Sequence, residues 1–195
     1  METPKRSLAC ALVLLLGLSA CGYNSIQSAD ESVKAAWAEV QNQYQRRMDL
    51  IPNLVNTVKG AADFEKETLE AVIQARASAT SVKMDASILD DPNAFKKFQE
   101  SQGQLSSALG RLLVVSERYP QLTATAGFRD LQAQLEGTEN RITVARKRYV
   151  DAVAEYNKLV RFFPTNLTAR YLLHADVKPT FEAAQGAEKP PEVKF

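Results

Sequence analysis

One cysteine of this chain stands where a lipid-modifying enzyme would need a thiol. Cys21 directly follows an apolar run over residues 8–20, and this run comes after Lys5 and Arg6. A basic start, a short apolar segment and small residues before a cleavage point make up a secretory signal. A cysteine thiolate at that point is a nucleophile that can accept a diacylglyceryl group as a thioether. The pattern predicts a lipoprotein signal peptide over residues 1–20 and acylation of Cys21 with palmitate-type chains.

The alternative is an uncleaved membrane anchor. A spanning helix needs about 20 apolar residues, and the run over residues 8–20 is shorter than that. Two or more acyl chains hold a protein stably on a bilayer, so a lipidated Cys21 would be a sufficient anchor. We therefore expect a bacterial cell-envelope protein that faces the periplasm or the cell exterior. Gly22 after the cysteine favours the outer over the inner membrane without deciding between them.

Other chemistry is sparse in the sequence. His174 is the one histidine, so there is no second imidazole for a metal cluster or a di-iron bundle. No serine, cysteine or threonine lies in a nucleophile turn, and no glycine-rich loop could hold phosphate. The 24 basic residues balance 23 acidic ones, which removes the electrostatic argument for nucleic acid. We expect no enzyme, no metal and no cofactor.

The elements that must position these residues are helices. Glycine and proline are rare over residues 30–163, where strong helix formers dominate. Apolar residues recur at steps of three and four along three segments. The first should begin at Ser28, where Glu31 completes a capping box, and should kink or break between Pro52 and Gly60. This composition predicts an all-α fold: an elongated antiparallel bundle of three to four long helices.

Two further helices follow a loop over residues 82–91. Asp91 and Pro92 predict a capped start, and Pro120 a stop. The helix after Thr125 has the most regular repeat, which is typical of coiled-coil packing. A short helix over residues 166–174 should precede an irregular tail. The predicted organisation is residues 1–20 signal peptide, 21–29 lipidated N-terminus and linker, 30–174 helical bundle domain, and 175–195 C-terminal tail.

Residues 46–55, with the sequence RRMDLIPNLV, closely resemble the LemA family of bacterial membrane-associated proteins. Further matching motifs follow along nearly the whole chain, among them Tyr119-Pro120 and Phe163-Pro164. Two departures are Phe64, where the family often has histidine, and Val150, where it often has asparagine. The resemblance implies a helical bundle outside the cytoplasmic membrane and no established enzymatic activity.

The polar residues of this signature have two interpretations. In the structural one, Pro52 frees the carbonyl of Met48, and a nearby polar side chain satisfies that carbonyl so that the bend can be buried. Asn53 or an arginine would supply the hydrogen bond. In the functional one, the polar side chains form a partner-binding surface at the bend. The residues concerned are Arg46, Arg47, Asp49, Pro52 and Asn53.

Four further charges lie on or beside the apolar stripes: Glu65, Arg76, Glu139 and Arg146. We predict buried polar pairs in which Glu65 and Arg76 contact the third helical region, with Glu139 and Arg146 as their partners. Such pairs would fix the register of neighbouring helices while adding little net stability. Solvated flanks are the simpler alternative. A cryptic hydrolase that uses Glu65 and Glu139 is the enzymatic one.

The predicted function is a non-enzymatic, lipid-anchored envelope protein whose bundle serves protein–protein interaction. Alternatives are an accessory or regulator of an envelope protease and the cryptic hydrolase. The protease alternative rests on the end of the chain, because a PDZ-type domain could capture the side chain and carboxylate of Phe195. Folding of Phe181, Val193 and Phe195 back onto the bundle is the competing interpretation of that end.

Overall fold

A computed structural model describes residues 3–61 and 64–182, with side chains described from Gly22 onward. The described residues form helices and contain no strand. The long helices are α1 (Thr3–Lys59), α2 (Lys66–Ser81), α3 (Pro92–Ser116) and α5 (Ala126–Arg161). The short helical elements are η1 (Ala86–Asp90), α4 (Pro120–Thr123), α6 (Thr165–Thr168) and η2 (Ala169–Leu173). The predicted all-α class is confirmed.

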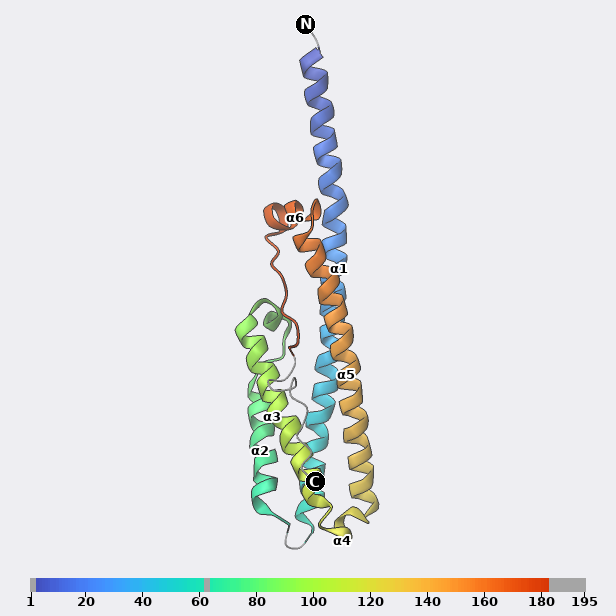
Figure 1. The fold of residues 1–195 in the computed structure, drawn as a ribbon, viewed down its shortest axis with the longest axis vertical. Coiled ribbons are helices and arrows are strands. Elements are labelled where there is room, and N and C mark those ends of the chain that lie inside the picture. Colours follow the sequence, from blue (N-terminus) through green and yellow to red (C-terminus); the bar gives the residue numbers. More distant parts are fainter. Residues whose placement is uncertain (1–2, 62–63, 183–195) are drawn as a thin grey trace, which may run out of the picture.

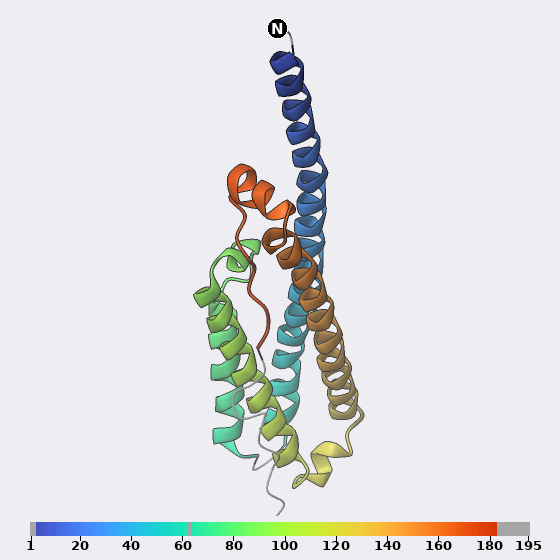
Figure 2. The same ribbon diagram turned by 45° about the horizontal axis from the view of Figure 1, so that its top comes forward.

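The four long helices alternate in direction and form two pairs (Figure 1). Helix α1 packs along α5, and α2 packs along α3. The first part of α1 projects beyond the other helices at the end of the bundle where α6 lies (Figure 2). The opposite end contains α4 and the connection between α1 and α2. The bundle is therefore elongated, as the sequence predicts.

The predicted start of the first helix at Ser28 is wrong. Helix α1 begins at Thr3 and passes through Ser28, whose carbonyl accepts a hydrogen bond from the Ser32 hydroxyl. Glu31 does not reach back to a cap but bonds the Lys34 ammonium at 2.9 Å. Gly22, Asn24 and Ser25 are weak helix formers, so propensity does not carry the helix through this stretch. Tertiary packing does, because Ile26 is buried and Gly22 lies against α6.

The other predicted helix ends agree with the structure except at Pro120, because α3 already ends at Ser116 and Pro120 begins α4. Helix α1 ends at Lys59 and the chain turns at Gly60, while Pro52 lies inside the helix. The Asp91 side chain caps α3, accepting from the amides of Asn93 and Ala94 at 2.9 and 3.1 Å. The Thr125 hydroxyl accepts from the Phe128 amide at the start of α5. Local capping chemistry thus sets these boundaries.

The core consists of two clusters stacked along the bundle. The aromatic cluster lies nearer the projecting end of α1, and the aliphatic cluster lies nearer α4. Large members of the aromatic cluster are Trp37, Tyr44, Phe95, Phe98 and Tyr149. Large members of the aliphatic cluster are Ile51, Leu54, Leu105, Leu112 and Phe128. Along each long helix they are separated by combinations of three- and four-residue steps, as the apolar pattern of the sequence predicts.

The start of the predicted tail has neither helix nor strand, yet it packs against the bundle. Over residues 175–182 it runs beside the aromatic cluster, and we call this segment the strap. The ring of Phe181 lies 5.0 Å from that of Phe95 and 5.5 Å from that of Tyr149, between centroids. The Tyr149 hydroxyl donates to the carbonyl of Pro179, and the Asn157 side chain bonds the backbone of Lys178 on both sides. The fold-back interpretation is confirmed for Phe181, whereas Val193 and Phe195 lie outside the described residues.

Candidate functional site

The signature residues all lie on α1, but they face different environments. Arg47 is buried, with 1% of its surface exposed, because it falls on the same helical face as Tyr44 and Ile51. The exposed side chains are those of Arg46, Asp49, Pro52 and Asn53. The single predicted surface therefore divides into one interior arginine and a set of exposed neighbours.

The Arg47 guanidinium joins three helices. Its Nη1 donates to the Ser106 hydroxyl of α3 at 2.6 Å and to a Glu139 carboxylate oxygen of α5 at 2.9 Å. Its Nη2 donates to the side-chain and backbone oxygens of Gln102 on α3. The ring of Tyr44 lies one turn away, with its centroid 5.0 Å from the guanidinium carbon. A planar group with five donors suits this many acceptors, which lysine could not satisfy in the same way.

This polar layer separates the two core clusters. Along α1 the aromatic cluster reaches Tyr44 and the aliphatic cluster resumes at Met48, with Arg47 between them. Along α3, Gln102 lies between Phe98 and Leu105. A glutamine within an otherwise apolar stripe was therefore the sequence signal for the layer. We call Arg47, Gln102, Ser106 and Glu139 the arginine layer.

A cavity of about 330 Å³ opens at the outer side of the arginine layer. Glu139, Arg146 and Tyr44 contribute to its wall. Burial raises the pKa of the Tyr44 phenol, and the positive charges of Arg146 and Arg47 oppose that increase. Tyr44 therefore stays neutral near pH 7, and the charged groups of the cavity wall are carboxylates, the Arg146 guanidinium and the Lys96 ammonium.

The carbonyl that Pro52 leaves free is satisfied by an arginine. Arg76 on α2 donates from Nε to the carbonyl oxygen of Met48 at 3.3 Å. Pro52 has no amide hydrogen for that carbonyl, so a donor from a neighbouring helix takes its place. The structural interpretation of the signature is thus supported, with Arg76 rather than Asn53 in the role.

The predicted polar pairs are wrong in their partners. Glu65 bonds Arg118, which follows α3, and the Thr68 hydroxyl. Glu139 pairs with Arg47 instead, and Arg146 places its guanidinium carbon 4.3 Å from the centroid of the Phe181 ring. The cause is geometric: Glu65 meets Arg118 in the turn that leads into α4, whereas Glu139 and Arg146 lie well along α5, beside Arg47 and Phe181 respectively. Stripe membership gives the face of a residue but not its neighbour across the bundle.

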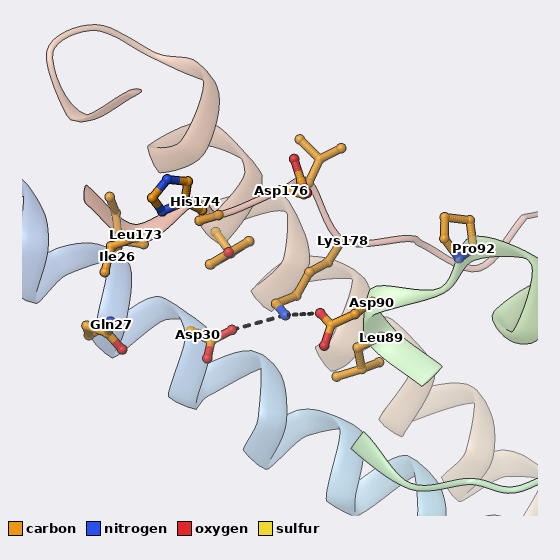
Figure 3. Close-up of a pocket in the computed structure, with 13 residues that line it drawn as sticks. Ile26, Gln27, Asp30, Leu89, Asp90, Pro92, Leu173, His174, Asp176 and Lys178 are labelled. Carbon is orange, nitrogen blue, oxygen red and sulfur yellow. Dashed lines mark hydrogen bonds and ion pairs between the residues drawn. The ribbon is translucent and has the colours of Figure 1, made fainter. Parts of the chain in front are cut away.

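A second polar cluster forms where the strap crosses the bundle (Figure 3). The Lys178 ammonium lies 3.1 Å from a carboxylate oxygen of Asp30 on α1 and 3.2 Å from one of Asp90 in η1. Only 9% of the Lys178 side chain is exposed. The three groups border a cavity of about 720 Å³ whose wall also includes His174. This cluster was not predicted from the sequence, because the strap has no periodic pattern.

The charges of this cluster hold one another ionised. Burial opposes the charge of Asp30, but hydrogen bonds from Lys34 and Lys178 outweigh it and lower the pKa of the carboxyl. Burial likewise opposes the charge of Lys178, but Asp30 and Asp90 hold its pKa above the ordinary lysine value. These ion pairs thus hold the strap against α1 and η1.

Metal-binding side chains are not gathered in the part of the chain that the structure describes. No group of three or more His, Cys, Asp or Glu residues there could hold a metal ion. In the same part, no helix is both long and apolar enough to cross a membrane.

Together these features define an elongated all-α bundle with two core clusters and an arginine layer built on the signature of α1. The LemA family model matches residues 36–195, a range that includes all four residues of the arginine layer. The chain belongs to the LemA family.

The relatives found by sequence comparison are distant. The magnetosome protein MamQ of Magnetospirillum gryphiswaldense is 25% identical over 86% of this chain and 72% of its own length. The magnetosome protein MamQ 2 of Paramagnetospirillum magneticum is 24% identical over 75% of this chain and 60% of its own. Protein LemA of Metamycoplasma hominis is 25% identical over 76% of this chain and 61% of its own. Two of these three matches leave about two fifths of the relative uncovered.

Proposed function

We propose that this protein is a non-enzymatic, lipid-anchored protein of the bacterial cell envelope whose bundle serves protein–protein interaction. The observation that supports this most is the continuity of α1, which runs from the predicted anchor segment through both core clusters. An acyl group on Cys21 would therefore attach directly to the helix that organises the bundle. The proposal is made at the level of the family, since the named relatives are distant.

The settings of the two candidate catalytic carboxylates support a structural role. A general acid needs a pKa raised towards neutrality. Glu65 has its pKa lowered, chiefly by the hydrogen bond from Arg118 and then by that from Thr68. Glu139 lines a cavity but is paired with Arg47. The hydrolase alternative is therefore not supported, because each of its two candidate carboxylates, Glu65 and Glu139, is paired with an arginine.

The exposed part of the signature offers a face for a partner. Arg46, Asp49 and Asn53 follow one another at steps of three and four, so they lie along one side of α1. Asp49 accepts a hydrogen bond from Gln45 at 2.7 Å, and Arg46 is exposed beside it. Packing of the bundle does not account for these side chains. We call them the signature face and propose it as a contact surface for an envelope protein.

Lipid anchoring is tested by replacing each cysteine in turn. Cys21→Ser in the native host should abolish labelling by an alkyne analogue of palmitate and leave an uncleaved precursor. Cys10→Ser is the matched control, because Cys10 lies within the predicted signal peptide and its labelling should be unchanged. Labelling that persists in Cys21→Ser would refute the anchor.

The contact surface is tested by photocrosslinking in intact cells. A photoreactive amino acid at position 46 or 53 should give a discrete crosslinked band. Adding Asp49→Lys to the same chain should remove that band. The same amino acid at position 147, an exposed site on α5, is the control. Equal crosslinking from position 147 would refute the signature face as a specific contact surface.

The protease alternative rests on Phe195, which lies outside the described residues.

A further inference from the structure

Large apolar side chains are exposed together at one end of the bundle. They belong to the turn that follows α5, to α6 and η2, and to the adjacent turn of α1. We call this set the apolar cap; its members are Tyr23, Phe162, Phe163, Leu167, Tyr171 and Leu172. Phe163 is 79% exposed and Tyr171 is 70% exposed. Elsewhere in the described chain, large exposed apolar residues such as Val114 on α3 occur singly, which is normal for a protein surface.

The apolar cap lies beside the point where α1 leaves the bundle. Gly22 is buried, and a side chain there would meet Thr165 and Thr168 of α6 at 3.3 Å. Helix α6 thus packs on the residue that directly follows Cys21. Figures 1 and 2 both show α6 at the end from which the first part of α1 projects. Whatever surface receives an anchor at Cys21 must therefore also face the cap.

The charge of this end fits a bilayer that contains anionic lipid. Over residues 155–176 the basic residues Lys158, Arg161 and Arg170 outnumber the acidic Glu155, which pairs with Lys158, and Asp176. Both arginines are exposed, and Arg170 lies over the ring of Tyr171, 5.7 Å from its centroid. Aromatic rings flanked by cations are typical of residues at the membrane–water interface. A water-facing surface of this composition has no comparable reason to be apolar.

We propose that the apolar cap inserts into the headgroup region of the membrane that holds the anchor, so that the bundle is attached by two contacts rather than by one tether. The cap would place its aromatic and leucine side chains at the boundary of headgroups and acyl chains, with Arg161 and Arg170 beside lipid phosphates. The bundle would then stand at a fixed orientation with the α4 end away from the bilayer. This inference rests on the proposed attachment at Cys21.

Tryptophan fluorescence tests the contact in the full chain. The native Trp37 is buried in the aromatic cluster and provides the same background in every variant. Protein purified from host membranes is reconstituted in vesicles of phosphatidylcholine and phosphatidylglycerol whose acyl chains are brominated near the headgroups. Tyr171→Trp should lose roughly half or more of its added fluorescence to the brominated lipid, as expected at interfacial depth. Val114→Trp, at an exposed site two residues before the end of α3 that leads into α4, should lose almost none.

The outcomes separate the possible occupants of the cap. Quenching of the new tryptophan by aqueous acrylamide but not by brominated lipid would show that the cap faces water and would overturn the proposal. Protection from both quenchers would show that protein covers the cap, which also overturns it. If Tyr171→Trp disturbs the fold, as judged by circular dichroism, Leu172→Trp reports on the same surface. Removing phosphatidylglycerol should weaken the lipid quenching, and unchanged quenching would refute the role of the arginines.

Failure of this inference can be told apart from failure of the proposed function. If the unmodified chain does not sediment with the vesicles, the attachment itself is wrong. If it sediments while the tryptophan at position 171 is not quenched by lipid, only the insertion of the apolar cap is refuted. The protein would then be attached through its lipid anchor alone.

Discussion

The two core clusters lie in one bundle but are built differently. The aliphatic cluster is assembled almost entirely from the long helices, with Leu54, Leu105 and Leu112 from stripes that repeat along the chain. The aromatic cluster needs the strap as well, since Phe181 packs against Trp37, Phe95 and Tyr149. Half of the molecule thus depends on local helical periodicity, while the other half depends on a segment without regular structure. The half that needs the strap is the half beside the predicted anchor.

The arginine layer is the boundary between these halves, and its removal should have the largest effect. Arg47→Ala should lower the free energy of unfolding by about 3 kcal/mol, because it leaves a cavity and strands the oxygens of Gln102. Glu139 would be less affected, since about half of its side chain already reaches water. Urea unfolding measures the change.

Arg46→Ala is the matched control, since Arg46 is the exposed neighbour of Arg47 in the same signature. We expect it to change the free energy of unfolding by less than about 0.5 kcal/mol. Similar urea midpoints for the two variants would contradict the arginine layer.

Loss of the strap contact should separate the two halves. Phe181→Ala removes a half-buried ring from three aromatic contacts and should cost about 2 kcal/mol. Hydrogen exchange should speed up in the part of α1 near Trp37 and stay nearly unchanged in α1 around Leu54. Uniform acceleration along α1 would show that the clusters unfold as one unit.

Val114→Ala is the control for Phe181→Ala. Val114 is 73% exposed on α3, so its loss should leave both halves unchanged.

The Lys178 cluster gives the aromatic half a pH dependence of its own. The pKa of Asp30 is lowered from 3.8, so its contribution to stability is present above that pH and is lost as pH falls below it. The pKa of Lys178 is raised from 10.5, so its contribution is present below that pH and is lost as pH rises above it. Lys178→Met should therefore flatten the alkaline limb of the stability profile and only part of the acid limb, because Lys34 still lowers the pKa of Asp30. Urea unfolding across the pH range, with the surface variant Lys147→Met for comparison, tests this.

The same contrast explains how much of the fold the sequence could predict. Stripe residues such as Val40, Leu112 and Ile142 are buried as their spacing requires, because a helix turns its side chains with a fixed period. The start at Ser28 was wrong, because packing of Gly22 and Ile26 in the bundle continues the helix through residues whose own helix propensity is weak. Periodicity is a local property and predicts what local geometry decides.

The candidate site was predicted only in part for a related reason. Arg47 was identified, but its partners depend on how far each helix has run along the axis, which connecting loops set. Glu65 and Arg118 meet only because the start of α2 lies beside the turn between α3 and α4. The Lys178 cluster depends on a strap with no period at all. The spacing of residues within one helix therefore does not predict which residues of another helix or of the strap they contact.

The smallest expected effect concerns Pro52, at the aliphatic side of the arginine layer. Pro52→Ala restores a backbone amide that can donate to the Met48 carbonyl, which Arg76 now satisfies. Arg76→Gln should cost about 1 kcal/mol in the native background, where that carbonyl loses its donor, and clearly less in the Pro52→Ala background. A double-mutant cycle measured by urea unfolding gives the coupling energy, which should be about 0.5 kcal/mol or more. A coupling near zero would mean that Arg76 does not compensate for the proline, and the proline would then need a reason outside the bundle, such as the partner proposed for the signature face.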